Sequence, residues 1–426
     1  APDSLDKILD NALSAWEEQY GTGPSETTLA LRFKGIVQRA VEQTGHRVAI
    51  LVDEYDKPML QAIGNEELQK EYRNTLKPFY GVLKTMDGYI KLGFLTGVTK
   101  FGKVSVFSDL NNLKDISMRR DYIDICGITD KELHRYFDKD LHTLADVQGL
   151  DYETVCLEVQ KRYDGYHFNF NTPGIYNPFS LLNTFDAMTF GSYWFATGTP
   201  SYLVYLLKKH HYRLEEIEKV EVTEDVLDSI DSEGTNPIPV IYQSGYLTIK
   251  DYDPEFGLYT LDYPNREVEE GFVKYLMPFY IDKSEAEAPF EIRRFVGEVR
   301  NGNIDGFFHR LQSFFADAPY EVIVGQDPVR NVELFFQNVL FIVFRLAGFY
   351  TQVEYHTSRG RIDLVLKTDK FIYVMEFKQG ATAEEALAQI NEKGYADAFA
   401  SDPRTLYKIG VSFSDEQRNI ERWLVE

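Results

Sequence analysis

The clearest pattern of hydrophobic and polar positions lies near the C-terminal end of the chain. Residues 361–367 and 371–378 are rich in branched and aromatic side chains, and a polar step at 368–370 separates them. This pattern predicts a β-hairpin. If the hairpin closes symmetrically about Asp369 and Lys370, Asp363 lies directly opposite Glu376. Because side chains alternate between the two faces of a strand, Lys378 then shares the face of Glu376.

Two carboxylates and an ammonium group at one end of a hairpin have two interpretations. Carboxylate oxygens suit a hard cation such as Mg²⁺. A lysine beside them would stabilise an anionic transition state or help to position a water. Alternatively, Asp363 and Glu376 belong to a solvated face, and Lys378 makes an ordinary cross-strand ion pair. The spacing alone leaves both interpretations open.

The segments around the hairpin predict a compact α/β domain. Residues 331–350 form an apolar helical pattern in which Glu333 and Gln337 share a face. A strand is expected before the hairpin, at 350–356. After it we expect a helix with a capping box at its start, which carries Gln389 and Lys393 on one face, and then a strand at 406–413. The predicted order is helix, strand, strand, strand, helix, strand.

This order, together with the spacing D–(x)12–E-x-K, resembles the PD-(D/E)xK nuclease superfamily. The resemblance implies a restriction-endonuclease-like α-β-β-β-α-β domain over 329–426. It implies that Asp363 and Glu376 are both metal ligands and catalytic residues, that Lys378 is catalytic, and that Glu333 completes the metal site. The implied cofactor is Mg²⁺ or Mn²⁺.

The N-terminal part has the pattern of helices around a buried parallel sheet. Residues 5–20 and 27–43 read as helices, and the apolar run 48–52 predicts a parallel strand buried on both faces, which ends in Asp53 and Glu54. A second buried strand is expected at 91–96, ending in Thr96. An acidic pair after a strand is weak evidence for a nucleotide site, because a strand that ends in an ordinary acidic turn has the same sequence pattern.

The phrases "LVDEYDKPML" and "FLTGVTKFGKVSVFSDLNNLKDIS" resemble the bacterial AAA-ATPase-like family, many members of which carry a C-terminal PD-(D/E)xK domain. The resemblance implies that Asp53 holds Mg²⁺, Glu54 orients a water and Thr96 senses the γ-phosphate. The chain contains no GxxxxGK[ST] phosphate-binding loop. We therefore expect a truncated or degenerate ATPase module, which binds ATP and Mg²⁺ only if a loop lies upstream in the intact protein. ATP hydrolysis is not expected of the chain as it stands.

The middle of the chain completes the expected α/β multidomain organisation. Residues 126–280 resemble the helical lid and winged-helix portion of such ATPases, with strands expected at 245–249 and 257–261. Residues 281–328 are expected to be a helical connector. The ATPase-like domain then occupies 1–125 and the nuclease-like domain 329–426.

Charge and cysteine content narrow the choice of partners and compartment. The formal net charge is −22, of which residues 331–426 carry 11 − 14 = −3 and the preceding 330 residues −19. This argues against a protein that coats nucleic acid through Lys and Arg, and leaves nucleic acid as a partner of the C-terminal domain. Protein partners are also plausible. Two cysteines without a CxxC pair, no signal-peptide pattern and no apolar run of membrane-spanning length predict a soluble cytoplasmic protein. The oligomeric state is not predicted.

Two functions fit these patterns. The first is a metal-dependent nuclease that hydrolyses phosphodiester bonds of DNA or RNA, fused to an incomplete AAA-type ATPase module. The second is a non-catalytic regulatory or protein-binding module with a nuclease-like fold.

Overall fold

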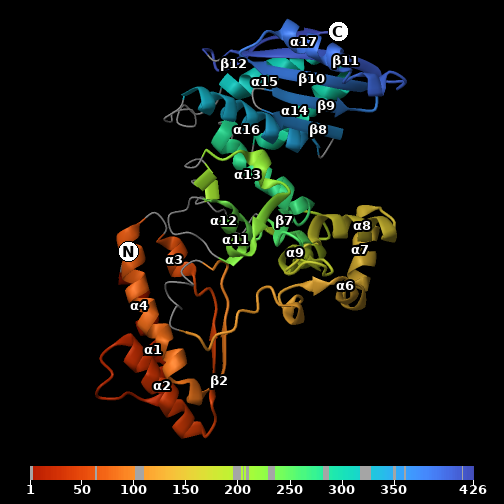
Figure 1. Cartoon of the computed structure of the whole chain (residues 1–426). Coiled ribbons are helices and arrows are strands. Elements are labelled where there is room, and N and C mark those ends of the chain that lie inside the picture. The colour runs from red at the N-terminus through yellow and green to blue at the C-terminus, as the bar shows by residue number, and fades with distance from the viewer. Residues whose placement is uncertain are drawn as a thin grey trace. The chain divides into compact units, whose positions relative to one another are not determined.

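The computed structural model divides the chain into two compact units (Figure 1). One unit comprises residues 1–126, 167–172 and 221–261, and the other comprises 127–166, 173–220 and 262–426. The structure describes residues 3–62, 65–100, 110–194, 203–204, 206–207, 211–228, 236–281, 287–316, 328–348, 352–358, 361–414 and 416–426. It describes the backbone but not the side chains at 3–4, 228, 281, 288, 328–333, 353–358 and 361–363.

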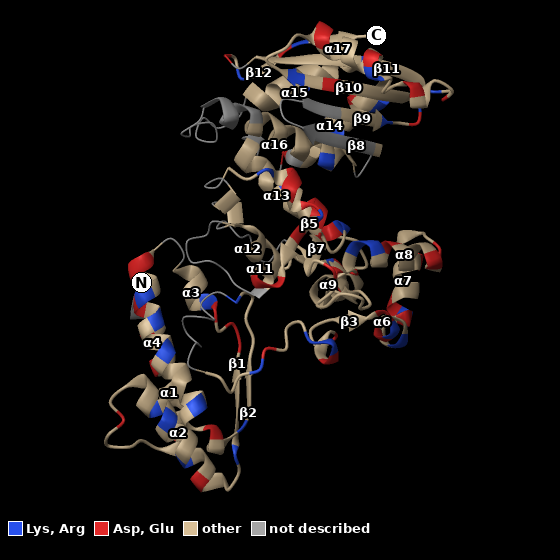
Figure 2. Ribbon diagram, viewed as in Figure 1, with Lys and Arg blue, Asp and Glu red and all other residues tan. Residues whose placement is uncertain are grey.

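The N-terminal part of the first unit packs helices against a pair of parallel strands. The elements are α1 (Asp3–Tyr20), α2 (Leu29–Thr44), β1 (Val48–Val52), α3 (Lys57–Gln61), α4 (Glu66–Thr85) and β2 (Ile90–Leu95). Their shared core includes Phe33 of α2, which stacks on Phe79 of α4 at 4.8 Å between ring centroids. Arg32 of α2 binds Glu17 of α1 at 2.8 Å. Both basic and acidic residues lie along α1, α2 and α4 (Figure 2).

The parallel pairing of β1 with β2 is confirmed, since Val52 lies opposite Leu95. The expectation that both faces of these strands are buried is wrong for the part of the chain that the structure describes. Ile50 and Val52 pack against the helical core, whereas Leu51 is 72% exposed and Leu92 is 52% exposed. The helices that the structure describes cover one face of these strands, and the alternate apolar positions lie on the other face.

The rest of the first unit contains the winged-helix-like region. Its elements are β5 (Val220–Thr223), α11 (Glu224–Asp228), α12 (Ile238–Gln243), β6 (Thr248–Asp253) and β7 (Leu258–Asp262). The strands form a sheet in the order β5-β7-β6. Both hairpin strands start later than expected, because Gly245 and Gly257 take left-handed φ values of 82° and 68°. These glycines end the preceding turns and do not begin the strands.

The second unit opens with a small helical group and continues to the long helix α13. The elements are β3 (Ile128–Thr129), α6 (Asp130–Tyr136), α7 (Asp138–Gln148), α8 (Tyr152–Tyr163), β4 (Ile175–Tyr176), α9 (Pro178–Ala187), η4 (Leu214–Ile217) and α13 (Arg266–Ile281). Helix α6 starts with a capping box between Thr129 and Glu132. The hydrophobic core of this helical group contains Val155 and Tyr163 of α8 and Leu181 of α9.

The C-terminal domain is a five-stranded sheet between two helical layers. Its elements are α14 (Ala288–Asn301), α15 (Ile304–Ala316), α16 (Pro328–Gly348), β8 (Gln352–Ser358), β9 (Arg361–Lys367), β10 (Phe371–Gln379), α17 (Ala383–Lys393), β11 (Thr405–Ser414) and β12 (Asn419–Val425). The strand order is β12-β11-β10-β9-β8, and β10 and β11 are parallel. In Figure 1, α17 lies on one side of this sheet and α14, α15 and α16 on the other. The expected order of elements from α16 to β11 is confirmed, and β12 adds a strand.

Helices α14 and α15 belong to this core, although their segment was expected to be a connector. Phe308 of α15 stacks on Trp423 of β12 at 5.0 Å between ring centroids. The Tyr373 hydroxyl of β10 donates to the Val299 carbonyl of α14 at 2.6 Å. The sequence shows the helices but not the sheet face they cover, because apolar stripes on connector and core helices look alike.

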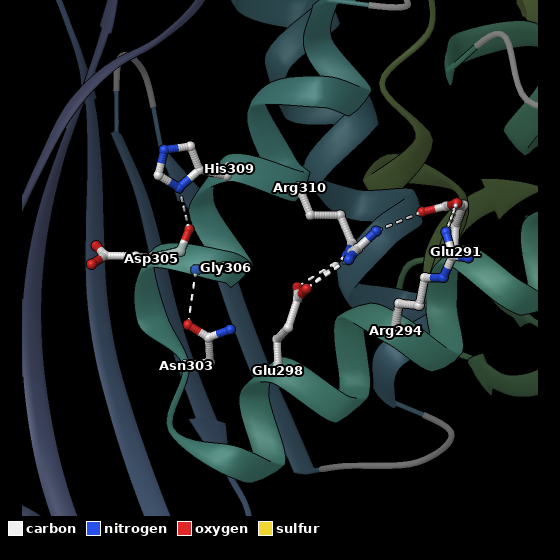
Figure 3. Close-up of polar contacts among 8 residues, drawn as sticks. All are labelled: Glu291, Arg294, Glu298, Asn303, Asp305, Gly306, His309 and Arg310. Atoms are coloured by element: carbon white, nitrogen blue, oxygen red, sulfur yellow. Dashed lines mark hydrogen bonds and ion pairs between the residues drawn. The ribbon is translucent and has the colours of Figure 1, made fainter.

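An ion-pair cluster fixes α14 against α15 (Figure 3). The Arg310 guanidinium of α15 binds the Glu298 carboxylate of α14 at 2.6–3.1 Å and Glu291 at 2.9 Å. Charge-assisted contacts with two carboxylates hold the guanidinium in one orientation. The α14–α15 pair is therefore held by polar contacts on one side and by aromatic packing on the sheet.

A second cluster joins α16 to the helical part of the same unit. Arg345 near the end of α16 lies 2.9 Å from a Glu218 carboxylate oxygen and 2.6 Å from one of Glu269 in α13. Burial raises the pKa of Glu218 to about 7, and the positive charge of Arg345 offsets this rise only in part.

None of the described helices is long and apolar enough to cross a membrane.

The Glu218 carboxyl predicts a pH dependence of stability. A carboxyl whose pKa is raised on folding stabilises the fold below pH 4.5, and this stabilisation is lost as the pH rises towards 7. Glu218→Gln should therefore raise the free energy of unfolding at pH 8 by about 1–3 kcal/mol relative to wild type, and leave it nearly unchanged at pH 4. Urea unfolding across this pH range measures the difference.

Glu216→Gln is the matched control, because the Glu216 side chain is 54% exposed and lies 3.7 Å from Arg213. It should follow the wild-type pH profile. A Glu218→Gln protein that loses stability at pH 8 would show instead that the ion pair with Arg345 outweighs the cost of burying the charge.

Candidate functional site

The C-terminal site rests on the register between β9 and β10. Glu376 lies directly opposite Asp363, and Lys378 lies opposite Arg361. The predicted symmetric hairpin is therefore confirmed. Register matters here because a slip by one residue would move every side chain of a strand to the other face of the sheet. In the observed register, both acidic positions and both basic positions share one face.

Glu376 is fully buried, with an exposed fraction of 0%. Its neighbours Met375 and Phe377 are buried on the opposite face. The interpretation of Glu376 as part of a solvated face is therefore wrong. The side chains of Asp363 and Glu333 lie outside the described residues, so the roles predicted for them remain predictions.

Helix α17 buries Glu376 because the neighbouring strand has a glycine. Gly410 of β11 lies beside Glu376 in the register. A methyl group at Gly410 would collide with the Ala383 carbonyl oxygen and the Leu387 amide nitrogen of α17. The glycine therefore lets the helix backbone approach the sheet closely at the level of the buried carboxylate.

The flanks of α17 face different strands. On one flank, Asn391 binds Lys408 of β11 at 2.7 Å, and Glu384 pairs with Arg422 of β12 at 2.7 Å. Gln389 lies on the flank turned away from these contacts, on the β9 side, and is half-buried. Lys393 follows it at i+4 on the same flank. The pair expected on one face of this helix therefore borders the half of the sheet that contains Asp363.

Helix α16 packs on the other face of the sheet. Its Phe344 lies 6.2 Å from the Phe377 ring, and its Phe336 stacks on Phe413 of β11 at 4.1 Å. Because Phe377 and Glu376 point to opposite faces of the sheet, α16 and Glu376 lie on opposite faces. Glu333 belongs to α16, one turn before Phe336. Within the described residues, no group of three His, Cys, Asp or Glu side chains is placed to hold a metal ion.

The register also brings two residues to the site that the sequence analysis did not single out. Arg361 is one, and the symmetric pairing that gave Asp363 would have found it. His356 of β8 is the other, because it lies opposite Asp363. The sequence analysis expected a strand at 350–356 but did not pair it with 361–367, so it did not bring His356 to the site.

A second candidate site lies at the ends of β1 and β2. The parallel pairing places Asp53 and Thr96 side by side, and the Thr96 hydroxyl donates to an Asp53 carboxylate oxygen at 2.5 Å. Glu54 takes a left-handed φ of 53°, and its carboxylate pairs with Lys57 at 2.6 Å. The sequence analysis missed Asp56, which is buried and accepts hydrogen bonds from the Thr99 amide at 2.6 Å and hydroxyl at 2.7 Å.

The comparisons with known proteins match the two parts of the chain that contain these candidate sites. Residues 1–107 match the family model described as "Predicted AAA-ATPase", and residues 331–423 match that of the "PD-(D/E)XK nuclease superfamily". The chain is 33% identical over 431 residues to the "Uncharacterized protein in vnfD 5'region" of Azotobacter chroococcum mcd 1. The alignment covers 99% of this chain and 80% of that protein.

The chain belongs to the family of AAA-ATPase-like proteins that carry a PD-(D/E)XK nuclease superfamily domain. The domain composition expected from the sequence is thereby confirmed. Nucleases of this superfamily generally use divalent metal ions. No solved structure matches the chain significantly.

The close approach of α17 to β11 predicts an effect on stability. Gly410→Ala should lower the free energy of unfolding by about 1–3 kcal/mol, because the added methyl group meets backbone atoms that cannot rotate away. The control is Gly297→Ala in α14, where a methyl group meets no atom within 4 Å. It should be neutral or stabilising by up to about 1 kcal/mol. Chemical denaturation of both variants tests this, and equal stability would contradict the close packing.

Proposed function

We propose that the C-terminal domain hydrolyses phosphodiester bonds in DNA or RNA with the help of a divalent metal ion, Mg²⁺ or Mn²⁺. The observation that carries this proposal is the register, which sets the fully buried Glu376 directly opposite Asp363. Lys378 occupies the next position of β10 on the same face. The family-model match over residues 331–423 supports the same reading.

The donor chemistry of this site fits a divalent metal ion. Burying a carboxylate is costly unless a positive charge compensates it, and a second carboxylate position across the strand adds to that cost. Carboxylate oxygens are the ligands that Mg²⁺ and Mn²⁺ favour. Asp363 and Glu376 would hold the ion. The resemblance also implies Glu333 as a third ligand, although its helix α16 packs on the other face of the sheet.

The residues of the site have separate roles in the proposed reaction. A bound divalent ion would supply a Lewis acid and lower the pKa of a water ligand. Lys378 shares the face of Glu376, so its ammonium group stabilises the negative charge that develops on the phosphate. Gln389, on the flank of α17 that borders β9, helps to orient the attacking water or the phosphate through its amide.

The Asp53–Thr96 pair is proposed to act on the Mg²⁺–ATP complex only together with a glycine-rich phosphate-binding loop. Asp53 would hold the ion, Glu54 would orient water and Thr96 would sense the γ-phosphate. The sequence contains no such loop, and a carboxylate pair does not replace the backbone amides that cradle phosphates.

We propose a cytoplasmic location for the protein. Its two cysteines, Cys126 and Cys156, are not disulfide-bonded, which is typical of that compartment.

Cleavage assays test the nuclease proposal. The 426-residue protein is incubated with labelled DNA and RNA substrates in Mg²⁺, Mn²⁺ or EDTA. Asp363→Ala, Glu376→Gln and Lys378→Ala should each lower the rate at least about a hundredfold, because each removes charge next to the reacting phosphate. Glu384→Gln is the matched control, since Glu384 is an exposed acid on the other flank of α17 and pairs with Arg422.

Equal cleavage by wild type and Asp363→Ala would show that the activity comes from elsewhere. No cleavage of any substrate by wild type would favour the second function, a regulatory or protein-binding module with a nuclease-like fold.

A further inference from the structure

Arg361 and Lys378 form an unusual pair, because two basic residues lie directly opposite each other in the register. Like charges at directly opposed positions of a sheet are destabilising. The next pair on the same face is Asp363 and Glu376, which also has two like charges. The fold thus places an acidic pair and a basic pair next to each other, with about 7 Å between successive same-face positions of one strand.

The four residues together carry no net charge, since two positive and two negative groups cancel. A divalent cation at the acidic pair changes the sum to 2 − 2 + 2 = +2 on this face of the sheet. Such a face attracts a ligand with several negative charges. The inference therefore rests on the proposed function, in which the metal ion and a phosphodiester bind together.

The arrangement of α17 indicates which half of the sheet this ligand crosses. The helix contacts β10, β11 and β12. On β9, Leu364 and Leu366 are buried, whereas Val365 and Lys367 are only partly buried. Positions 361 and 363 share the face of Val365, because strand residues two apart point the same way. On the same face of β10, Ile372, Val374 and Glu376 are buried. The α17 side of the sheet is therefore less covered over β9 than over β10.

We propose that Arg361 binds a backbone phosphate adjacent to the scissile phosphate, and that the nucleic-acid strand crosses the β9 half of the sheet beside α17. A guanidinium suits this role because its planar donors match two phosphate oxygens at once. Lys378 then serves the reacting phosphate and Arg361 its neighbour. Arg361 is a substrate-binding residue that positions the strand.

Arg422 gives a matched control within the same row of the sheet. The register links Lys378 to Ser412 and Ser412 to Arg422, so Arg422 lies on the far side of Lys378 from Arg361. It is on the other flank of α17, where its 59% exposed side chain pairs with Glu384 at 2.7 Å. An exposed pair of this kind contributes little to stability, so removing it should not disturb the fold.

The experiment measures binding without cleavage. Short fluorescent oligonucleotides of one sequence, as single-stranded DNA, single-stranded RNA and duplex DNA, are titrated with the 426-residue protein in Ca²⁺ at several salt concentrations. Arg361→Ala should bind about tenfold more weakly than wild type, which corresponds to the loss of one charge-assisted contact. The slope of the logarithm of its binding constant against the logarithm of salt concentration should be shallower by about one, as expected for the loss of one phosphate contact. Arg422→Ala should match wild type, and Arg361→Lys should recover part of the affinity.

The possible outcomes separate this inference from the proposed function. If wild type binds and Arg361→Ala binds equally well with the same salt dependence, the role of Arg361 is wrong and the nuclease proposal stands. If Arg422→Ala weakens binding as much as Arg361→Ala, the strand does not follow the β9 half. If wild type binds none of the oligonucleotides, both the nuclease proposal and this inference are overturned. Thermal unfolding of each variant checks that the fold is intact.

Discussion

The pairing register of β9 with β10 is the constraint on which the C-terminal domain depends. One set of backbone hydrogen bonds decides that Asp363 opposes Glu376 and that Arg361 opposes Lys378. It also sends Phe377 to the opposite face, where its ring meets Phe344 of α16 and Phe413 of β11. A shift by one residue would exchange these faces and bring the charges into the aromatic layer. The aromatic packing and the charged site therefore require the same register.

The cost of burying Glu376 is offset by the packing on both sides of the sheet. Above it, α17 approaches the backbone of β11 at Gly410. Below it, Phe308 and Phe344 are buried against the Phe377 ring. Each large apolar side chain buried in this way contributes about 1.5–3 kcal/mol, an upper estimate because the unfolded chain also buries some surface. Several such residues together provide the stability that a buried carboxylate requires.

The sequence predicted the parts of the site that depend on local pattern. Alternation and a polar turn were enough to place Asp363 opposite Glu376, and helical spacing put Gln389 and Lys393 on one flank of α17. The sequence did not show that α14 and α15 cover the sheet, because apolar stripes do not identify their partner. It also failed for Leu51, since a continuous apolar run does not reveal how many layers surround a strand. The sequence also did not show which face of the sheet α16 covers. Glu333 was assigned to the metal site by resemblance, but α16 packs on the face opposite Glu376.

The central claim is that the opposed carboxylates of β9 and β10 bind a divalent cation, and calorimetric titration of the 426-residue protein with Mn²⁺ tests it most directly. The account predicts a binding event in wild type that disappears in the double variant Asp363→Asn, Glu376→Gln, while Asp53→Asn leaves it unchanged. The same heat of binding in wild type and the double variant, or no binding in wild type, would contradict the account.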